Sequence, residues 1–240
     1  MCRVSTLGVD YVDIEAQIAI DYPDSPDKLK HYCEVIRQVI PGNWCYHGAG
    51  HAYLQITTDV NKALDKCDSL EGGIETNLEN CHRGIFSEYG NRALGYDGDT
   101  GKSLPGSPRV KLDLDNPYGF CKSLDQKYRP ACYSQLTKVY ISGDIEESLN
   151  KCLKDSDIDI QKICINIISG VNSRGALATS DFLSAPKILS SMPQALRQAY
   201  IKGVKETFIG YEASGIEKDW EATCNSLNED IDRQFCYSLK

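Results

Sequence analysis

Residues 59–92 read DVNKALDKCDSLEGGIETNLENCHRGIFSEYGNR, and the rest of the chain can be interpreted from this stretch. Apolar residues recur at helical spacing before Cys67 and again after Cys81, which predicts two helices joined by a short connection. Asp59 precedes the first apolar position and has a side chain suited to an N-cap. The stretch is therefore typical of a helical hairpin with a disulfide near its bend.

The same arrangement of cysteines occurs five times along the 240-residue chain. Ten of the eleven cysteines form pairs whose positions differ by 12, 14, 11, 12 and 12 residues. In each pair the first cysteine ends a segment of helical periodicity and the second opens another. The absence of C-x-x-C argues against thioredoxin-type redox sites, zinc ribbons and c-type haem attachment. The predicted disulfides are Cys33–Cys45, Cys67–Cys81, Cys121–Cys132, Cys152–Cys164 and Cys224–Cys236.

The intervals between successive first cysteines predict how the hairpins are arranged. Intervals of 34 and 31 residues are typical periods of helical-hairpin repeats, whereas 54 indicates one period plus an insertion, and 72 indicates two periods. The insertion corresponds to the Gly- and Pro-rich segment 95–117, and the longest interval leaves room for a hairpin without cysteines. We therefore predict a single all-α domain over residues 1–240, an array or solenoid of antiparallel hairpins. The hairpins are expected at about 26–56, 59–92, 117–141, 144–176, 180–211 and 216–240.

Cysteine usage and charge indicate the compartment and exclude some partners. Disulfides persist in oxidising surroundings, so we expect an extracytoplasmic protein that is secreted, periplasmic or at the cell surface. The net charge of -8 argues against a nucleic-acid partner, and no apolar run is long enough for a transmembrane segment. Cys2, the eleventh cysteine, has three interpretations: a lipid anchor, a free thiol or an intermolecular disulfide.

One hairpin resembles a known family of repeats. NKALDKC at 61–67, followed by CHRG at 81–84 and EYG at 88–90, resembles extracytoplasmic Sel1-like or tetratricopeptide-type repeats. Some bacterial members of that group carry one disulfide per helical hairpin. This chain differs in that its cysteines are further apart and Gly84 follows the second cysteine by three positions rather than four. The resemblance implies an α-solenoid with a binding role, and it transfers no specific functional residue.

The histidines supply the candidate metal site. His47 and His51 lie four residues apart in CYHGAGHA at 45–52, so on a helix they share one face and could ligate one metal ion. In the register of the repeat, Glu88 falls one position beyond His51 on the neighbouring helix, and His82 is a further candidate ligand. Two histidines and a carboxylate suit Zn, or Fe(II) with open coordination positions.

The same stretch also has a purely structural interpretation, in which the histidines form hydrogen bonds between helices. Gly48 and Gly50 would each cost about 1 kcal/mol relative to Ala inside a helix, so they indicate close approach by another backbone or by a ligand. No G-x-S-x-G is present, and the pairing of the cysteines leaves no Cys–His nucleophile, so no catalytic residue is predicted.

Three functions remain open on these grounds. We expect a binding module that recognises a protein, peptide or glycan. One alternative is a metal-binding protein or metalloenzyme that uses His47, His51 and Glu88. The other is a structural subunit of a surface assembly.

Overall fold

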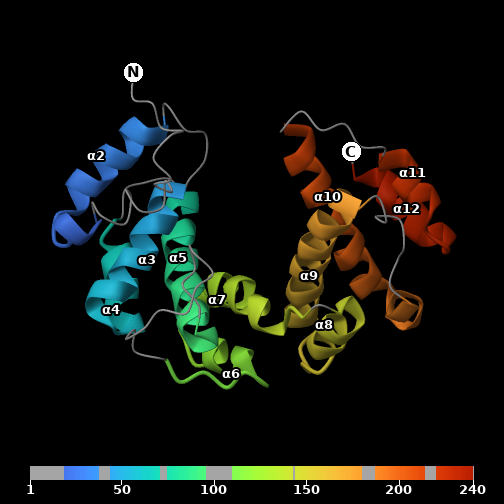
Figure 1. The fold of residues 1–240 in the computed structure, drawn as a ribbon, viewed down its shortest axis with the longest axis horizontal. Helices are drawn as coiled ribbons and strands as arrows, with labels where there is room; N and C mark the ends of the chain where they lie inside the picture. Colours follow the sequence, from blue (N-terminus) through green and yellow to red (C-terminus); the bar gives the residue numbers. More distant parts are fainter. Residues whose placement is uncertain are drawn as a thin grey trace. The chain divides into compact units, whose positions relative to one another are not determined.

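Figure 1 shows the fold of the chain as a computed structural model. The structure describes residues 19–37, 44–70, 75–95, 110–142, 144–179, 187–213 and 220–239. Every regular element in these ranges is a helix, which confirms the all-α class. Across the same ranges, no helix combines the length and the apolar character needed to cross a membrane. Cys2, with its interpretation as a lipid anchor, lies outside the described residues, as does 96–109 of the predicted insertion.

All five predicted disulfides are present, and each joins two successive α-helices. A disulfide that closes a loop of this length stabilises a fold by about 3 kcal/mol through the chain entropy that it removes from the unfolded state. The disulfide-linked pairs are α2 (Pro26–Arg37) with α3 (Trp44–Thr57), α4 (Val60–Asp68) with α5 (Glu75–Leu94), α6 (Pro117–Lys122) with α7 (Arg129–Leu136), α8 (Ile145–Cys152) with α9 (Ile158–Thr179), and α11 (Trp220–Asn225) with α12 (Asp230–Ser238).

The remaining elements that the structure describes lie within or between these pairs. Three short 3₁₀ helices are η1 (Gln126–Tyr128), η2 (Thr137–Tyr140) and η3 (Lys187–Ser191). The long helix α10 (Gln194–Ala213) follows η3 and carries no cysteine. Its core face is nevertheless apolar, because these residues are buried along it: Leu196, Ala199, Tyr200, Ile201, Val204 and Phe208.

The N-cap predicted at Asp59 is confirmed, and two other helices begin at residues suited to a helix start. The Asp59 side chain accepts a hydrogen bond from the Lys62 backbone nitrogen at 3.0 Å, as an N-cap of α4 should. Asp144 caps α8 in the same way by accepting from the backbone nitrogens of Glu146 and Glu147. Helix α2 begins at Pro26. Proline has no backbone N–H, but the first residue of a helix makes no intrahelical hydrogen bond through that group, so none is lost.

The chain divides into two compact units, Met1–Val139 and Tyr140–Lys240. The most extensive helix packing in the first unit is between α3 and α5, and in the second it is between α9 and α10 (Figure 1). We call these the α3–α5 contact and the α9–α10 contact. A single repeat domain over 1–240, with its antiparallel hairpins in a solenoid, stays a prediction.

Glycines bring α3 and α5 into direct backbone contact. A Cβ atom added to Gly84 would lie 2.0 Å from the carbonyl oxygen of His47, and one added to Gly50 would lie 2.1 Å from the carbonyl oxygen of Cys81. Only hydrogen fits at both positions. Close approach of the neighbouring helix therefore accounts for Gly50, one of the two explanations that the sequence allowed.

The α9–α10 contact repeats this construction. A Cβ atom added to Gly203 would lie 2.0 Å from the carbonyl oxygen of Asn166. The numbers of Gly84 and Gly203 differ by 119, and so do those of His47 and Asn166. The same offset relates the disulfides Cys33–Cys45 and Cys152–Cys164. Each unit therefore contains a disulfide-stapled helix that meets a later helix at a glycine in the corresponding register.

Candidate functional site

The candidate histidines lie on α3 where it contacts α5. His51 Nδ1 is 3.2 Å from Glu88 Oε2, and His51 Nε2 is 3.2 Å from His47 Nε2. Arg92 Nε donates to Glu88 Oε1 at 2.8 Å. His51, Glu88 and Arg92 are all buried. The structure thus brings His47, His51 and Glu88 together and adds Arg92, and we call these four residues the α3–α5 polar chain.

The partners of His51 restrict where its protons can lie. An ionised carboxylate only accepts hydrogen bonds, so the hydrogen bond between Glu88 and His51 needs a proton on Nδ1. The hydrogen bond between the two Nε2 atoms needs one further proton, which either ring can supply. In one arrangement His51 is doubly protonated and donates to His47, and in the other His47 donates to a neutral His51. The polar chain therefore has two proton arrangements that both satisfy the buried carboxylate.

Burial at His47 and hydrogen bonds at Glu88 set the protonation of the groups at the two sides of His51. Burial is the main cause that lowers the pKa of His47 to about 3, and the charge of His51 lowers it further. Burial alone would raise the pKa of Glu88, but hydrogen bonds from His51 and Arg92 outweigh this effect and hold the pKa below its usual value. At neutral pH, His47 is therefore uncharged and Glu88 is ionised.

Lys138 places a further amine beside α5. Its Nζ donates to the carbonyl oxygen of Ser87 and to Asn91 Oδ1. The aliphatic part of its side chain lies over Gly90, where an added Cβ would be 2.6 Å from Lys138 Cε. Burial lowers the pKa of Lys138 to about 8, against the opposing charge of Glu88. Part of the Lys138 population is therefore uncharged at mildly alkaline pH.

His82, the fourth predicted metal ligand, belongs to another cluster. Its Nε2 is 2.9 Å from Asp68 Oδ1, while Lys127 Nζ and the Tyr128 hydroxyl both donate to Asp68 Oδ2 at 2.6 Å. Burial alone would raise the pKa of Asp68, but the hydrogen bonds from Lys127, Tyr128 and His82 lower it. The carboxylate thereby fastens α4 to α5 and to η1, which gives His82 a structural partner.

Metal binding by His47 and His51 stays a prediction. Within the described ranges, no three His, Cys, Asp or Glu side chains are arranged to hold one metal ion. The two Nε2 atoms nevertheless face each other at 3.2 Å. Two nitrogens bonded to one tetrahedral Zn at its usual bond length would be about 3.3 Å apart. Glu88 contacts the opposite nitrogen of His51, so in such a site it would orient the ring rather than ligate the ion.

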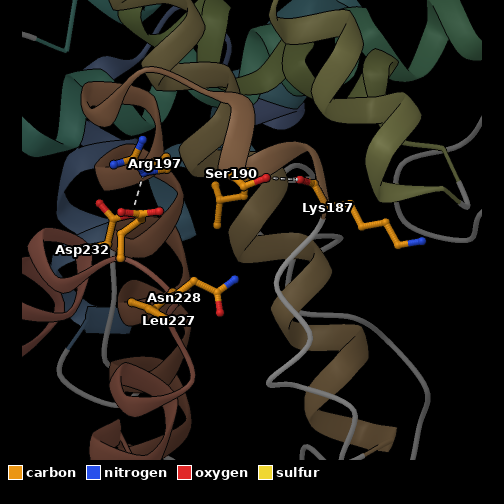
Figure 2. Close-up of a pocket in the computed structure, with 8 residues that line it drawn as sticks. Lys187, Ser190, Arg197, Leu227, Asn228 and Asp232 are labelled. Atoms are coloured by element: carbon orange, nitrogen blue, oxygen red, sulfur yellow. Dashed lines mark hydrogen bonds and ion pairs between the residues drawn. The ribbon is translucent and has the colours of Figure 1, made fainter.

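A cavity of about 310 Å³ lies in the second unit and is lined by η3, α10, the connection between α11 and α12, and the start of α12 (Figure 2). Arg197 Nε donates to Asp232 Oδ2 at 2.6 Å, and Arg197 Nη1 donates to the carbonyl oxygen of Met192 at 2.9 Å. Asp232 is only 3% exposed, and its other oxygen, Oδ1, has no hydrogen-bond donor among the described residues. The lining also includes Lys187, Leu189, Leu227, Asn228 and Glu229.

The unpaired oxygen of Asp232 is energetically unfavourable as it stands. A buried polar atom without a partner costs about 1–3 kcal/mol, and a charged one costs more. Arg197 compensates one side of the carboxylate only. A donor that reached Asp232 through the cavity would remove this cost, which makes the cavity a candidate binding site.

Sequence reasoning missed this cavity but could have found Arg92. Arg92 lies four residues after Glu88 on the same helix, and that spacing alone predicts an ion pair. Arg197 and Asp232 are 35 residues apart on different helices, and no motif connects them.

In comparisons with known proteins, no protein-family model, no curated protein and no solved structure matches the chain.

Proposed function

We propose that the chain is a helical-repeat binding module, built as a solenoid of hairpins, that recognises a protein, peptide or glycan. The five disulfides support an oxidising compartment, and we place the protein in the secreted, periplasmic or cell-surface class. The observation that carries the proposal is the cavity of the second unit, whose lining includes Asp232, a buried carboxylate with no donor to one of its oxygens among the described residues.

The lining of the cavity has the mixture of groups that binding requires. Leu189 and Leu227 supply apolar walls, whereas Arg197, Asn228 and Asp232 supply a few polar groups that can fix an orientation. The volume of about 310 Å³ is near the lower end of ligand pockets. The cavity therefore takes a small molecule, or one residue or sugar unit of a larger partner.

A matched pair of substitutions on η3 tests the binding function. Ser190 lines the cavity, whereas the adjacent Ser191 is not among its lining residues, and both residues are exposed. Ligand-observed NMR would screen short peptides, oligosaccharides and small polar metabolites against the native chain and against Ser190→Trp and Ser191→Trp. We expect at least one class to bind the native chain and Ser191→Trp, and to lose binding to Ser190→Trp. Equal behaviour of the three proteins towards every compound would overturn the proposal.

A second candidate function is metal binding by His47 and His51, and it is favoured by the 3.2 Å separation of their Nε2 atoms. We propose Zn, or Fe(II) with open positions, with Glu88 orienting His51. Metal analysis of protein purified without added metal, beside a His47→Ala/His51→Ala double variant, tests this. About one ion per chain in the native protein and none in the variant would support it. No metal in either sample, with unchanged melting, would remove it.

A further inference from the structure

We propose that the cavity of the second unit binds a free aliphatic α-amino acid as its zwitterion. This inference rests on the binding function proposed above and names the chemical class of the ligand. It depends on the two charged groups at the cavity wall, on the balance of charge around them, and on the apolar walls beside them.

Arg197 offers a place for the carboxylate of the ligand. Its Nε and Nη1 are engaged by Asp232 and by the carbonyl oxygen of Met192. Its third nitrogen, Nη2, makes no hydrogen bond to the residues that the structure describes, and Arg197 lines the cavity. A guanidinium group binds carboxylates in its own plane, so Nη2 is a suitable donor to an incoming carboxylate.

Asp232 offers a place for the ammonium group. Its Oδ1 has no donor among the described residues, although the side chain is only 5% exposed. That oxygen is itself buried and the residue lines the cavity, so it reaches a ligand by rotation about the terminal torsion, which is broad for aspartate. An ammonium group carries three donors and would supply the missing hydrogen bond.

The ion pair itself selects a ligand with both charges close together. Arg197 and Asp232 are joined at 2.6 Å, so a cation near Asp232 also meets the charge of Arg197 unless the ligand carries its own anion. An α-amino acid has its ammonium and carboxylate on one carbon, which matches this juxtaposition.

The other charged groups of the lining favour no net charge on the ligand. Lys187 and Glu229 offset each other, as Arg197 and Asp232 do. Figure 2 shows the amine of Lys187 pointing away from Arg197 and Asp232. A zwitterion therefore fits the cavity better than a simple amine or a simple acid.

The walls select an aliphatic side chain. Leu189 and Leu227 both line the cavity, and Leu189 is only 5% exposed. Burying a hydrocarbon side chain against them removes apolar surface from water and adds to affinity. A side chain of the size of leucine or valine suits a cavity of about 310 Å³.

A series of ligands with one carbon skeleton tests the inference without altering the protein. Isothermal titration would compare L-leucine with 3-methylbutylamine, which lacks the carboxylate, and with 4-methylpentanoate, which lacks the ammonium group. We expect leucine to bind at least tenfold more tightly than either analogue. Equal affinity of the three compounds, or no binding of leucine, would overturn the inference.

A matched pair of variants on α12 then locates the ammonium site. In Asp232→Asn, leucine should lose its advantage over 4-methylpentanoate, whereas Asp230→Asn, at an exposed position on the same helix, should keep it. Circular dichroism melting would show whether Asp232→Asn folds, and the ligand series decides if it does not. If another ligand binds in a Ser190→Trp-sensitive way while leucine does not, only the amino-acid inference fails. If nothing binds there, the proposed function fails as well.

Discussion

The α3–α5 contact and the α9–α10 contact share a backbone plan but differ in the side chains that fill them. In each, a helix stapled by a disulfide across 12 residues meets a later helix at a glycine, Gly84 in the first and Gly203 in the second. The offset of 119 residues relates the two contacts position by position. The backbone of both is therefore determined by the same two devices, a local disulfide and a glycine at the point of closest approach.

The polar chain has no ionisable counterpart at three of its positions. The offset pairs His47 with Asn166, His51 with Gly170 and Glu88 with Thr207. In place of the His51–Glu88 hydrogen bond, Thr207 Oγ1 donates to the carbonyl oxygen of Gly170 at 3.0 Å. Helices can therefore pack in this way without two histidines and a buried glutamate. The comparison favours a functional role for the polar chain, because packing alone does not require it.

The largest expected loss of stability comes from replacing the buried glutamate, Glu88. Glu88→Ala leaves Arg92 and His51 buried without their anion, and we expect the first unit to lose about 3–5 kcal/mol of stability. Thr207→Val removes only a neutral hydroxyl, whose proton is shared by the carbonyl oxygens of Gly170 and Gly203, and should cost about 1 kcal/mol. Chemical denaturation with hydrogen exchange of α5 and α10 amides would measure both. Similar losses of stability would show that charged groups contribute no more to the α3–α5 contact than to the α9–α10 contact, contrary to the comparison.

Glu79→Ala is the control for this measurement. Glu79 lies on the same helix and pairs with Arg83 at a more exposed position. Its removal should change the stability by about 1 kcal/mol or less, because exposed ion pairs contribute little.

The next largest loss of stability is expected on removal of the disulfide at each contact, and it should be equal in the two units. Cys33→Ala/Cys45→Ala and Cys152→Ala/Cys164→Ala each open a disulfide that spans 12 residues. Each should cost about 3 kcal/mol, because the unfolded chain regains the entropy of a loop of this length. Hydrogen exchange of α3 and α9 amides reports the two losses. A loss confined to one unit would show that the staples are not equivalent.

The glycines should also behave alike in the two contacts. Gly84→Ala and Gly203→Ala each force a Cβ to 2.0 Å from a backbone carbonyl oxygen, so we expect each to cost about 1–3 kcal/mol through overpacking. Gly170→Ala is the milder control, since its Cβ would be 3.3 Å from the nearest atoms. Thermal melts of the three variants would rank them. A Gly84→Ala protein as stable as the native chain would refute close backbone contact at this position.

Most of the local fold could be predicted from the spacing of residues in the sequence. A disulfide between neighbouring helices needs only two cysteines on either side of one bend, so all five pairs could be predicted from position alone. An N-cap such as Asp59 is equally local, because its partner lies three residues away. The repeat register also indicated that Glu88 and His51 belong to neighbouring helices, as their 3.2 Å contact shows.

Side-chain orientation and the cavity could not be predicted in this way. The separation of α3 and α5 decides which nitrogen of His51 faces Glu88. That separation depends on Gly50 and Gly84 together. The cavity depends on Arg197 and Asp232, which meet only after α10 and α12 have packed. Contacts between distant segments leave no periodic pattern in the sequence, so these features become visible only in the structure.

The last expected effect is a difference in acid sensitivity between the two contacts, which is small just below pH 6.5 and grows as the pH falls. His47 has a pKa of about 3 in the folded chain, against 6.5 when unperturbed, and burial is the main cause. As the pH falls from 6.5 towards 3, the unfolded chain takes up a proton at this residue and the folded chain does not. Stability is therefore present above pH 6.5 and is lost progressively below it, by up to about 1.4 kcal/mol per pH unit.

His47→Asn copies the residue that stands at the corresponding position of the α9–α10 contact, and it should remove this part of the pH dependence. Urea unfolding at intervals from pH 7 to pH 4, followed by hydrogen exchange of α3 and α9 amides, would measure the slopes. The native α3 should lose protection faster than α9 over this range, and the variant should bring the two slopes together. His31→Asn, on an exposed part of α2, is the matched control and should leave the slope of α3 unchanged. A slope that survives in His47→Asn would mean that another group takes up the proton, and Glu88, whose pKa is also lowered, would be the next to replace.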